Sequence, residues 1–127
     1  MNSPSFFLYT GIAGLLYSVY AGARYYSLSG LNLITATKAK KMIKNGDIKN
    51  IIDVRTKTEY NIGHYPRSKN VPITEFSERK FSKFNKNQGI LVYCNTGQRA
   101  RRAAELLESY GFTKVYYIDG LYSTIVL

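Results

Sequence analysis

Apolar residues occur along the chain in two patterns, as short continuous runs and at helical spacing. Continuous runs over residues 50–54 (NIIDV) and 89–93 (GILVY) are typical of strands buried on both faces of a sheet. Further extended segments are predicted at residues 31–34, 70–73 and 114–118. Turn residues and helical patterns separate these segments from one another.

Helices are predicted between the strands. Thr56 and Glu59 have the spacing of a capping box, which opens a short helix. The predicted helices run from Thr35 or Thr37 to the Asn45–Gly46 pair, from 56 to 62, from Thr74 through 84, and from 98 to 110. Because strands alternate with helices, we expect an α/β domain with a mostly parallel central sheet covered by helices on both faces. Ligands of such sheets bind at the carboxyl ends of the strands.

The N-terminal segment differs from the rest of the chain, because residues 1–23 contain no charged side chain and no histidine. As a helix, residues 3–23 would span about 31 Å, close to the ~30 Å hydrocarbon core of a bilayer. Arg24 and the two tyrosines that follow it suit a membrane interface. We therefore predict a transmembrane anchor at residues 1–24, a linker at 25–30 and a folded domain at 31–127.

The flanks of this segment predict its orientation. Basic residues follow the span and none precedes it: Arg24, Lys38, Lys40, Lys41 and Lys44. The positive-inside rule then places a single-pass protein's domain on the cytoplasmic side. The alternative is an exported protein cleaved near Ala23, although the segment lacks the basic start of a secretory signal.

Small residues lie at steps of four along the same segment: Thr10, Gly14, Ser18 and Gly22. This spacing places them on one helical face, where two membrane helices can approach closely. The pattern is weak, and it predicts at most a helix–helix dimer.

Composition narrows the classes of function. The chain has 127 residues, 45% of them hydrophobic, a formal net charge of +10 and a single cysteine. This apolar content excludes intrinsic disorder, and one cysteine excludes an internal disulfide and a cysteine-rich zinc site. The basic segment 79–86 carries Phe81 and Phe84, which we assign to the core rather than to base stacking. We therefore expect no nucleic-acid partner and no metal.

The candidate chemistry lies in residues 94–99, between a predicted buried strand and a helix start. A helix N-terminus presents unpaired N–H groups and a positive dipole end, which attract an anion and stabilise a thiolate. Cys94 is the candidate nucleophile, and Arg99 adds a positive charge. The remaining residues form the candidate substrate-binding loop: Asn95, Thr96, Gly97 and Gln98. The alternative interpretation is that Cys94 is a small buried core residue.

This loop resembles the active-site loop of the rhodanese family, which has the pattern C-x-x-G-x-R followed by a small residue. Residues 94–100 read CNTGQRA. Three further blocks resemble the family in the same order: DVR with Glu59 at 53–59, GHYPRSKNVP at 63–72, and residues 111–120. The similarity covers residues 31–125 and is greatest to small single-domain rhodaneses, including the phage-shock type. Arg67 stands where the family has a small glycine.

The resemblance implies a sulfurtransferase that needs no metal and no cofactor. The Cys94 thiolate would take the outer sulfur of a small anionic donor, thiosulfate or a persulfide. The resulting Cys94 persulfide would pass this sulfur to a thiol or to cyanide. Asp53, Arg55 and His64 would support the site structurally rather than react.

Two functions of other classes stay open. The first is a non-catalytic, membrane-tethered module that uses the rhodanese fold to dock a partner. The second is a cysteine-dependent phosphatase or arsenate reductase, whose loop has five residues between the cysteine and the arginine. Four residues separate Cys94 from Arg99, which disfavours the second alternative.

Overall fold

The computed structural model describes residues 9–20 and 33–118. These residues belong to two separate units, one within Met1–Leu31 and the other within Asn32–Leu127, and each unit is described by itself.

The second unit is built on a five-stranded sheet in which all four strand pairs are parallel. The strand order is β1-β5-β4-β2-β3. The strands are β1 (Leu33–Ile34), β2 (Ile48–Asp53), β3 (Lys69–Asn70), β4 (Gly89–Tyr93) and β5 (Val115–Ile118). The parallel sheet and its two central apolar strands confirm the predicted α/β class.

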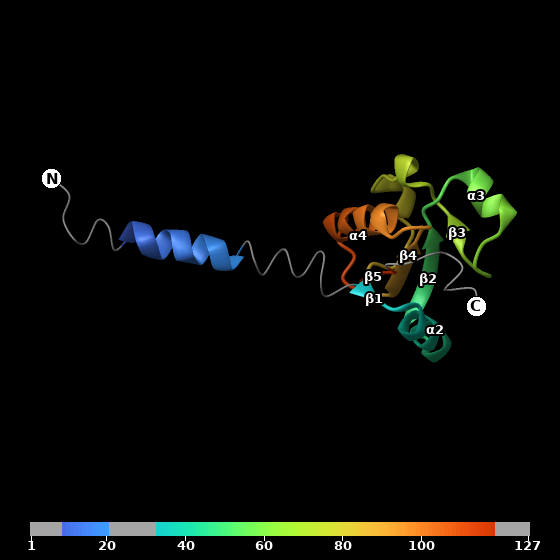
Figure 1. The fold of residues 1–127 in the computed structure, drawn as a ribbon, viewed down its shortest axis with the longest axis horizontal. Helices are drawn as coiled ribbons and strands as arrows, with labels where there is room; N and C mark the ends of the chain where they lie inside the picture. Colours follow the sequence, from blue (N-terminus) through green and yellow to red (C-terminus); the bar gives the residue numbers. More distant parts are fainter. Residues whose placement is uncertain (1–8, 21–32, 119–127) are drawn as a thin grey trace. The chain divides into compact units, whose positions relative to one another are not determined.

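Side-chain alternation along β4 divides the core into two layers. Ile90 and Val92 face α4 (Gln98–Ser109), whereas Leu91 and Tyr93 face α2 (Ala36–Asn45). Figure 1 shows these two helices on opposite faces of the sheet, as the sequence predicts. Every residue of β4 is buried, because a strand between two helical layers has no solvent-facing side.

The starts of β2 and β4 approach each other so closely that a side chain is excluded there. A Cβ atom on Gly89 would lie 2.0 Å from the carbonyl oxygen of Asp47. The glycine therefore allows the two central strands to pair from their first residues.

The helix ends follow the predicted capping residues. The Thr35 side chain accepts a hydrogen bond from Lys38 N, and Gly46 ends α2 in the left-handed conformation, with φ of 83°. Thr56 and Glu59 form the predicted capping box of α3 (Lys57–Ile62). This helix buries none of its residues, so its function is not to fill the core.

The helix predicted from Thr74 to Phe84 is wrong. The segment forms two short 3-10 turns, η1 (Ile73–Glu75) and η2 (Arg79–Phe81), separated by extended backbone at Phe76. The break allows three aromatic rings to cluster, with Phe81 4.9 Å from Phe76 and 5.2 Å from Phe84. Packing of these rings against the α4 layer outweighs the helical spacing of the sequence.

The first unit contributes one helical segment, residues 9–20. Its large apolar side chains are exposed, among them Leu15 and Tyr17. Within the described residues, no helix has both the length and the apolar character needed to cross a membrane. The predicted anchor (residues 1–24) and its cleavage site near Ala23 extend outside the described residues, as does the linker at 25–30.

Candidate active site

Cys94 directly follows β4, at the carboxyl end of the central strand, and it is 1% exposed. Its sulfur accepts hydrogen bonds from the backbone N–H groups of Gly97 (3.1 Å) and Ala100 (3.3 Å). No side-chain oxygen caps α4, so the sulfur satisfies amides that a serine or aspartate would usually satisfy. The contacts place the sulfur at the positive end of a 12-residue helix.

The backbone of the loop depends on Gly97. This residue occupies the left-handed region with φ of 89°, which residues with a side chain rarely adopt. It is buried, whereas Thr96 and Gln98 are exposed. The roles predicted for residues 94–99 stay predictions, and the amide of Ala100 is a sulfur contact that the sequence interpretation missed.

Arg99 is held by Glu59 of α3 through two parallel hydrogen bonds. Nη1 lies 2.8 Å from Oε1 of Glu59, and Nη2 lies 3.1 Å from Oε2. Asn95 donates to the same carboxylate at 2.5 Å. Chiefly because of the hydrogen bond from Arg99, and to a lesser degree because of hydrogen bonds from Thr56, the pKa of Glu59 falls from 4.5 to about 2. The pKa of Arg99 is raised, mainly by Glu59 and to a lesser degree by Cys94.

Glu59 is the residue that sequence reasoning missed at this site. Its place in the capping box explains its position in α3, but its partner Arg99 lies 40 residues away. The local pattern contained no signal for that pairing. The resemblance to the rhodanese blocks included Glu59 without giving it a role.

Two further arginines of α4 are also paired. Arg101 and Arg102 each lie 3.6 Å from the carboxylate of Glu105. The positive charge of the three arginines is therefore largely balanced by two glutamates. An anion at Cys94 would be attracted chiefly by the helix start.

Asp53 and Arg55 form a second pair at the end of β2. The Arg55 guanidinium donates to both carboxylate oxygens of Asp53, at 2.7 to 3.0 Å, and also to the carbonyl oxygen of Gly63. Both residues are buried, and Arg55 lies over the ring of Tyr93, with 5.8 Å to its centroid. Burial, together with nearby Asp53, raises the pKa of the Tyr93 hydroxyl.

His64 lies in the turn after α3. Its Nδ1 lies 2.8 Å from the carbonyl oxygen of Tyr60, so this nitrogen carries the proton. The ring stacks on Tyr60 at a centroid distance of 3.7 Å. Both contacts are those of a hydrogen-bonded turn, and the roles predicted for His64, Asp53 and Arg55 stay predictions.

Comparison with known proteins agrees with this geometry. The family of the Rhodanese-like domain matches residues 35–126. The chain belongs to this family. The rhodanese-like domain of the Alr3790 protein from Anabaena sp. has the same fold, with a TM-score of 0.66 and 28% identity over 74% of this chain and 72% of that one.

The chain spans less than half the length of two curated relatives that it matches. A tRNA uridine(34) hydroxylase of Buchnera aphidicola is 35% identical over 92 residues, which are 68% of this chain and 29% of the relative. The putative sulfur carrier protein YrkF of Bacillus subtilis is 31% identical over 87 residues, 68% of this chain and 46% of the relative. Neither name supports the narrower resemblance to phage-shock rhodaneses, which stays a prediction.

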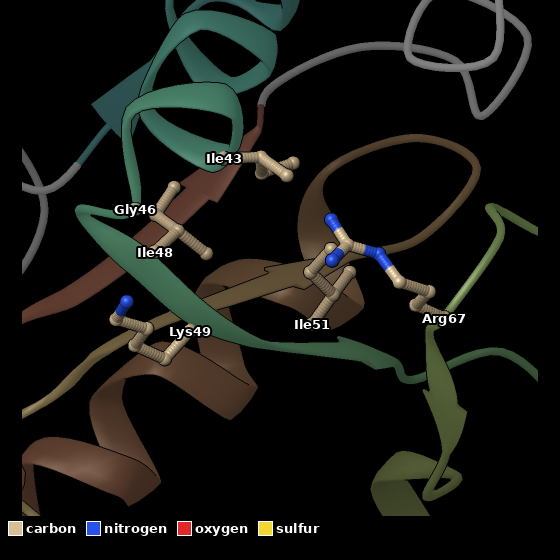
Figure 2. Close-up of a pocket in the computed structure, with 6 residues that line it drawn as sticks. All are labelled: Ile43, Gly46, Ile48, Lys49, Ile51 and Arg67. Atoms are coloured by element: carbon tan, nitrogen blue, oxygen red, sulfur yellow. The ribbon is translucent and has the colours of Figure 1, made fainter.

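Arg67 stands where the family has a glycine, and it lies away from the Cys94 layer. It lines a cavity of about 250 Å³ together with Lys49 and apolar residues of the α2 layer. Figure 2 shows its guanidinium group extending from its turn toward Ile51. The positive charge of Arg67 is therefore directed to the side of the sheet opposite the Cys94 layer.

Proposed function

We propose that this rhodanese is a sulfurtransferase that carries sulfane sulfur on Cys94. The observation that supports the proposal best is the pair of amides, Gly97 N and Ala100 N, directed at the Cys94 sulfur from a helix start. These donors stabilise negative charge on a sulfur atom. The reaction requires such stabilisation for the Cys94 thiolate before sulfur transfer and for the Cys94 persulfide after it. The name of the sulfur carrier relative is in keeping with such chemistry.

The reaction proceeds in two displacements. The Cys94 thiolate attacks the outer sulfur of thiosulfate or a persulfide; the donor's S–S bond breaks, and its electron pair leaves with sulfite or a thiolate. A thiol or cyanide then attacks the outer sulfur of the Cys94 persulfide and restores the thiolate. No metal or cofactor takes part in either step, and every bond broken is matched by one formed.

The test is intact-mass measurement of the full chain after incubation with thiosulfate or a small persulfide. We expect a gain of about 32 Da, one sulfur atom, that a thiol or cyanide removes. Cys94→Ser should show no gain and no transfer, whereas Ser109→Ala, at the far end of α4, should behave as the wild type. A variant lacking Cys94 that still transfers sulfur would reject the mechanism.

The two alternatives predict other outcomes of the same measurements. A docking module would show no sulfur gain with either donor. A phosphatase or arsenate reductase would hydrolyse an aryl phosphate in a vanadate-sensitive reaction. The loop with four residues between Cys94 and Arg99 leads us to expect no such hydrolysis.

Attachment to a membrane through residues 3–23 is a separate proposal, carried by the uncharged sequence of that segment. If it is correct, the full chain should stay in the membrane fraction through carbonate extraction. In sealed inside-out vesicles, protease should remove the domain. Protection of the domain there would contradict the cytoplasmic orientation, and release by carbonate would contradict the anchor.

A further inference from the structure

The carboxylate of Glu59 makes more contacts than a helix cap requires. Its Oε1 accepts from Thr56 N (3.1 Å), Thr56 Oγ1 (3.0 Å) and Arg99 Nη1 (2.8 Å). Its Oε2 accepts from Asn95 Nδ2 (2.5 Å) and Arg99 Nη2 (3.1 Å). Two of these partners belong to the loop that carries Cys94. The capping box therefore fixes a negative charge beside the reactive loop.

This charge changes what a sulfur donor encounters at the loop. Arg99 and Glu59 together have no net charge, and a two-point fork of this kind is difficult to displace. An arginine on its own would favour a dianion over a monoanion, because its attraction increases with the charge of the ligand. With Glu59 in place, this preference is offset, and the amides at the helix start remain to bind the donor.

We propose that Glu59 determines the donor specificity of the site: it neutralises Arg99 and so favours monoanionic sulfane-sulfur donors over the dianion thiosulfate. This inference rests on the proposed function. Glu59 acts through Arg99, so it is a positioning residue rather than a catalytic one. Its effect should appear in the ratio of kcat/KM for two donors of different charge, and not only in the rate with each.

A matched pair of donors isolates charge from shape. Methanethiosulfonate has a methyl group in place of one oxygen of thiosulfate and carries one negative charge instead of two. In both reactions the Cys94 thiolate takes the terminal sulfur as a persulfide. The electron pair of the broken S–S bond leaves as methanesulfinate in one reaction and as sulfite in the other.

The experiment compares kcat/KM for these two donors in the full-length wild type and in Glu59→Gln. Glutamine keeps an acceptor for Arg99 but removes the charge. We expect KM for thiosulfate to fall about tenfold and KM for methanethiosulfonate about threefold, because the lost repulsion scales with donor charge. The donor ratio should thus shift about threefold toward thiosulfate, and added salt should reduce the shift.

Two controls separate this effect from others. Glu105→Gln removes one negative charge from beside Arg101 and Arg102, both of which pair with Glu105. This variant should keep the donor ratio within about twofold of the wild type. Glu59→Asp keeps the charge and should keep the wild-type ratio even if kcat falls. A Glu59→Gln variant that loses rate equally with both donors would show a merely structural role and overturn the inference.

The same measurement distinguishes failure of the inference from failure of the function. A wild type that transfers sulfur from neither donor would overturn both. A wild type that is active, with a donor ratio that Glu59→Gln leaves unchanged or that Glu105→Gln shifts equally, would overturn the inference alone.

Discussion

Two arginine–carboxylate pairs lie near the carboxyl ends of the central strands, and they differ in sequence separation and in exposure to solvent. Asp53 and Arg55 are two residues apart, and their side chains are 0% and 5% exposed. Glu59 and Arg99 are 40 residues apart, and their side chains are 28% and 33% exposed. The first pair binds one strand end to the turn at Gly63, whereas the second joins two segments around the reactive loop.

The difference indicates where this fold can vary its chemistry. A buried pair has no exchange with water, so removing one partner leaves a charge without compensation. A partly exposed pair can lose a partner at modest cost because water replaces it. We therefore expect the Asp53 pair to govern stability and the Glu59 pair to govern reactivity.

Breaking the buried pair should have the largest effect. Asp53→Asn leaves the Arg55 charge in the core, and we expect a loss of about 3–5 kcal/mol in the free energy of unfolding. Urea denaturation followed by circular dichroism measures it. Replacing both residues with apolar ones, Asp53→Leu with Arg55→Met, should cost less. If the single variant lost under 1 kcal/mol, the contrast between the two pairs would disappear.

The pair of Glu59 and Arg99 should contribute less to the free energy of unfolding, and this contribution should depend on pH. Because the pKa of Glu59 is about 2 in the folded chain and 4.5 in its ordinary state, the pair stabilises the fold above pH 4.5. That contribution is lost as the pH falls toward 2. Because about a third of each side chain is exposed, we expect a contribution of about 1 kcal/mol to the free energy of unfolding. Glu59→Gln should therefore be less stable than the wild type at pH 7 and equally stable near pH 2; parallel curves would contradict this.

Most of the fold could be predicted from the sequence, because strands buried on both faces leave continuous apolar runs and capping residues are local signals. The position of Cys94 at a strand end followed from the same runs. The pairing of Glu59 with Arg99 could not be predicted, since it depends on how α3 and α4 are placed around the sheet. The helix predicted around Phe76 and Phe81 was wrong because the packing of aromatic rings, which depends on distant residues, outweighs the helical spacing of the sequence.

Two matched threonine caps sharpen the comparison. Thr35 and Thr56 both accept a hydrogen bond from a backbone N–H at the start of a helix, so each change to alanine should cost about 1 kcal/mol. The Thr56 hydroxyl also donates to Glu59, which holds the loop. We expect Thr56→Ala to shift the ratio of kcat/KM for the two donors toward thiosulfate, by less than Glu59→Gln does, and Thr35→Ala to leave this ratio unchanged. Equal effects on this ratio would mean that Glu59 does not depend on its cap.

A third arginine provides the smallest test, because its backbone rather than its charge is unusual. Arg67 has φ of 68°, in a turn closed by a hydrogen bond from Ser68 N to Tyr65 O. A residue with a Cβ is strained there, and glycine is not. Arg67→Gly and Arg67→Ala both remove the side chain from its cavity, so their difference measures the backbone strain less the entropy that glycine adds to the unfolded chain. We expect the glycine variant to be more stable by about 1 kcal/mol in urea denaturation. Equal stability of the two variants would mean that the turn relaxes and that the backbone of Arg67 is not strained.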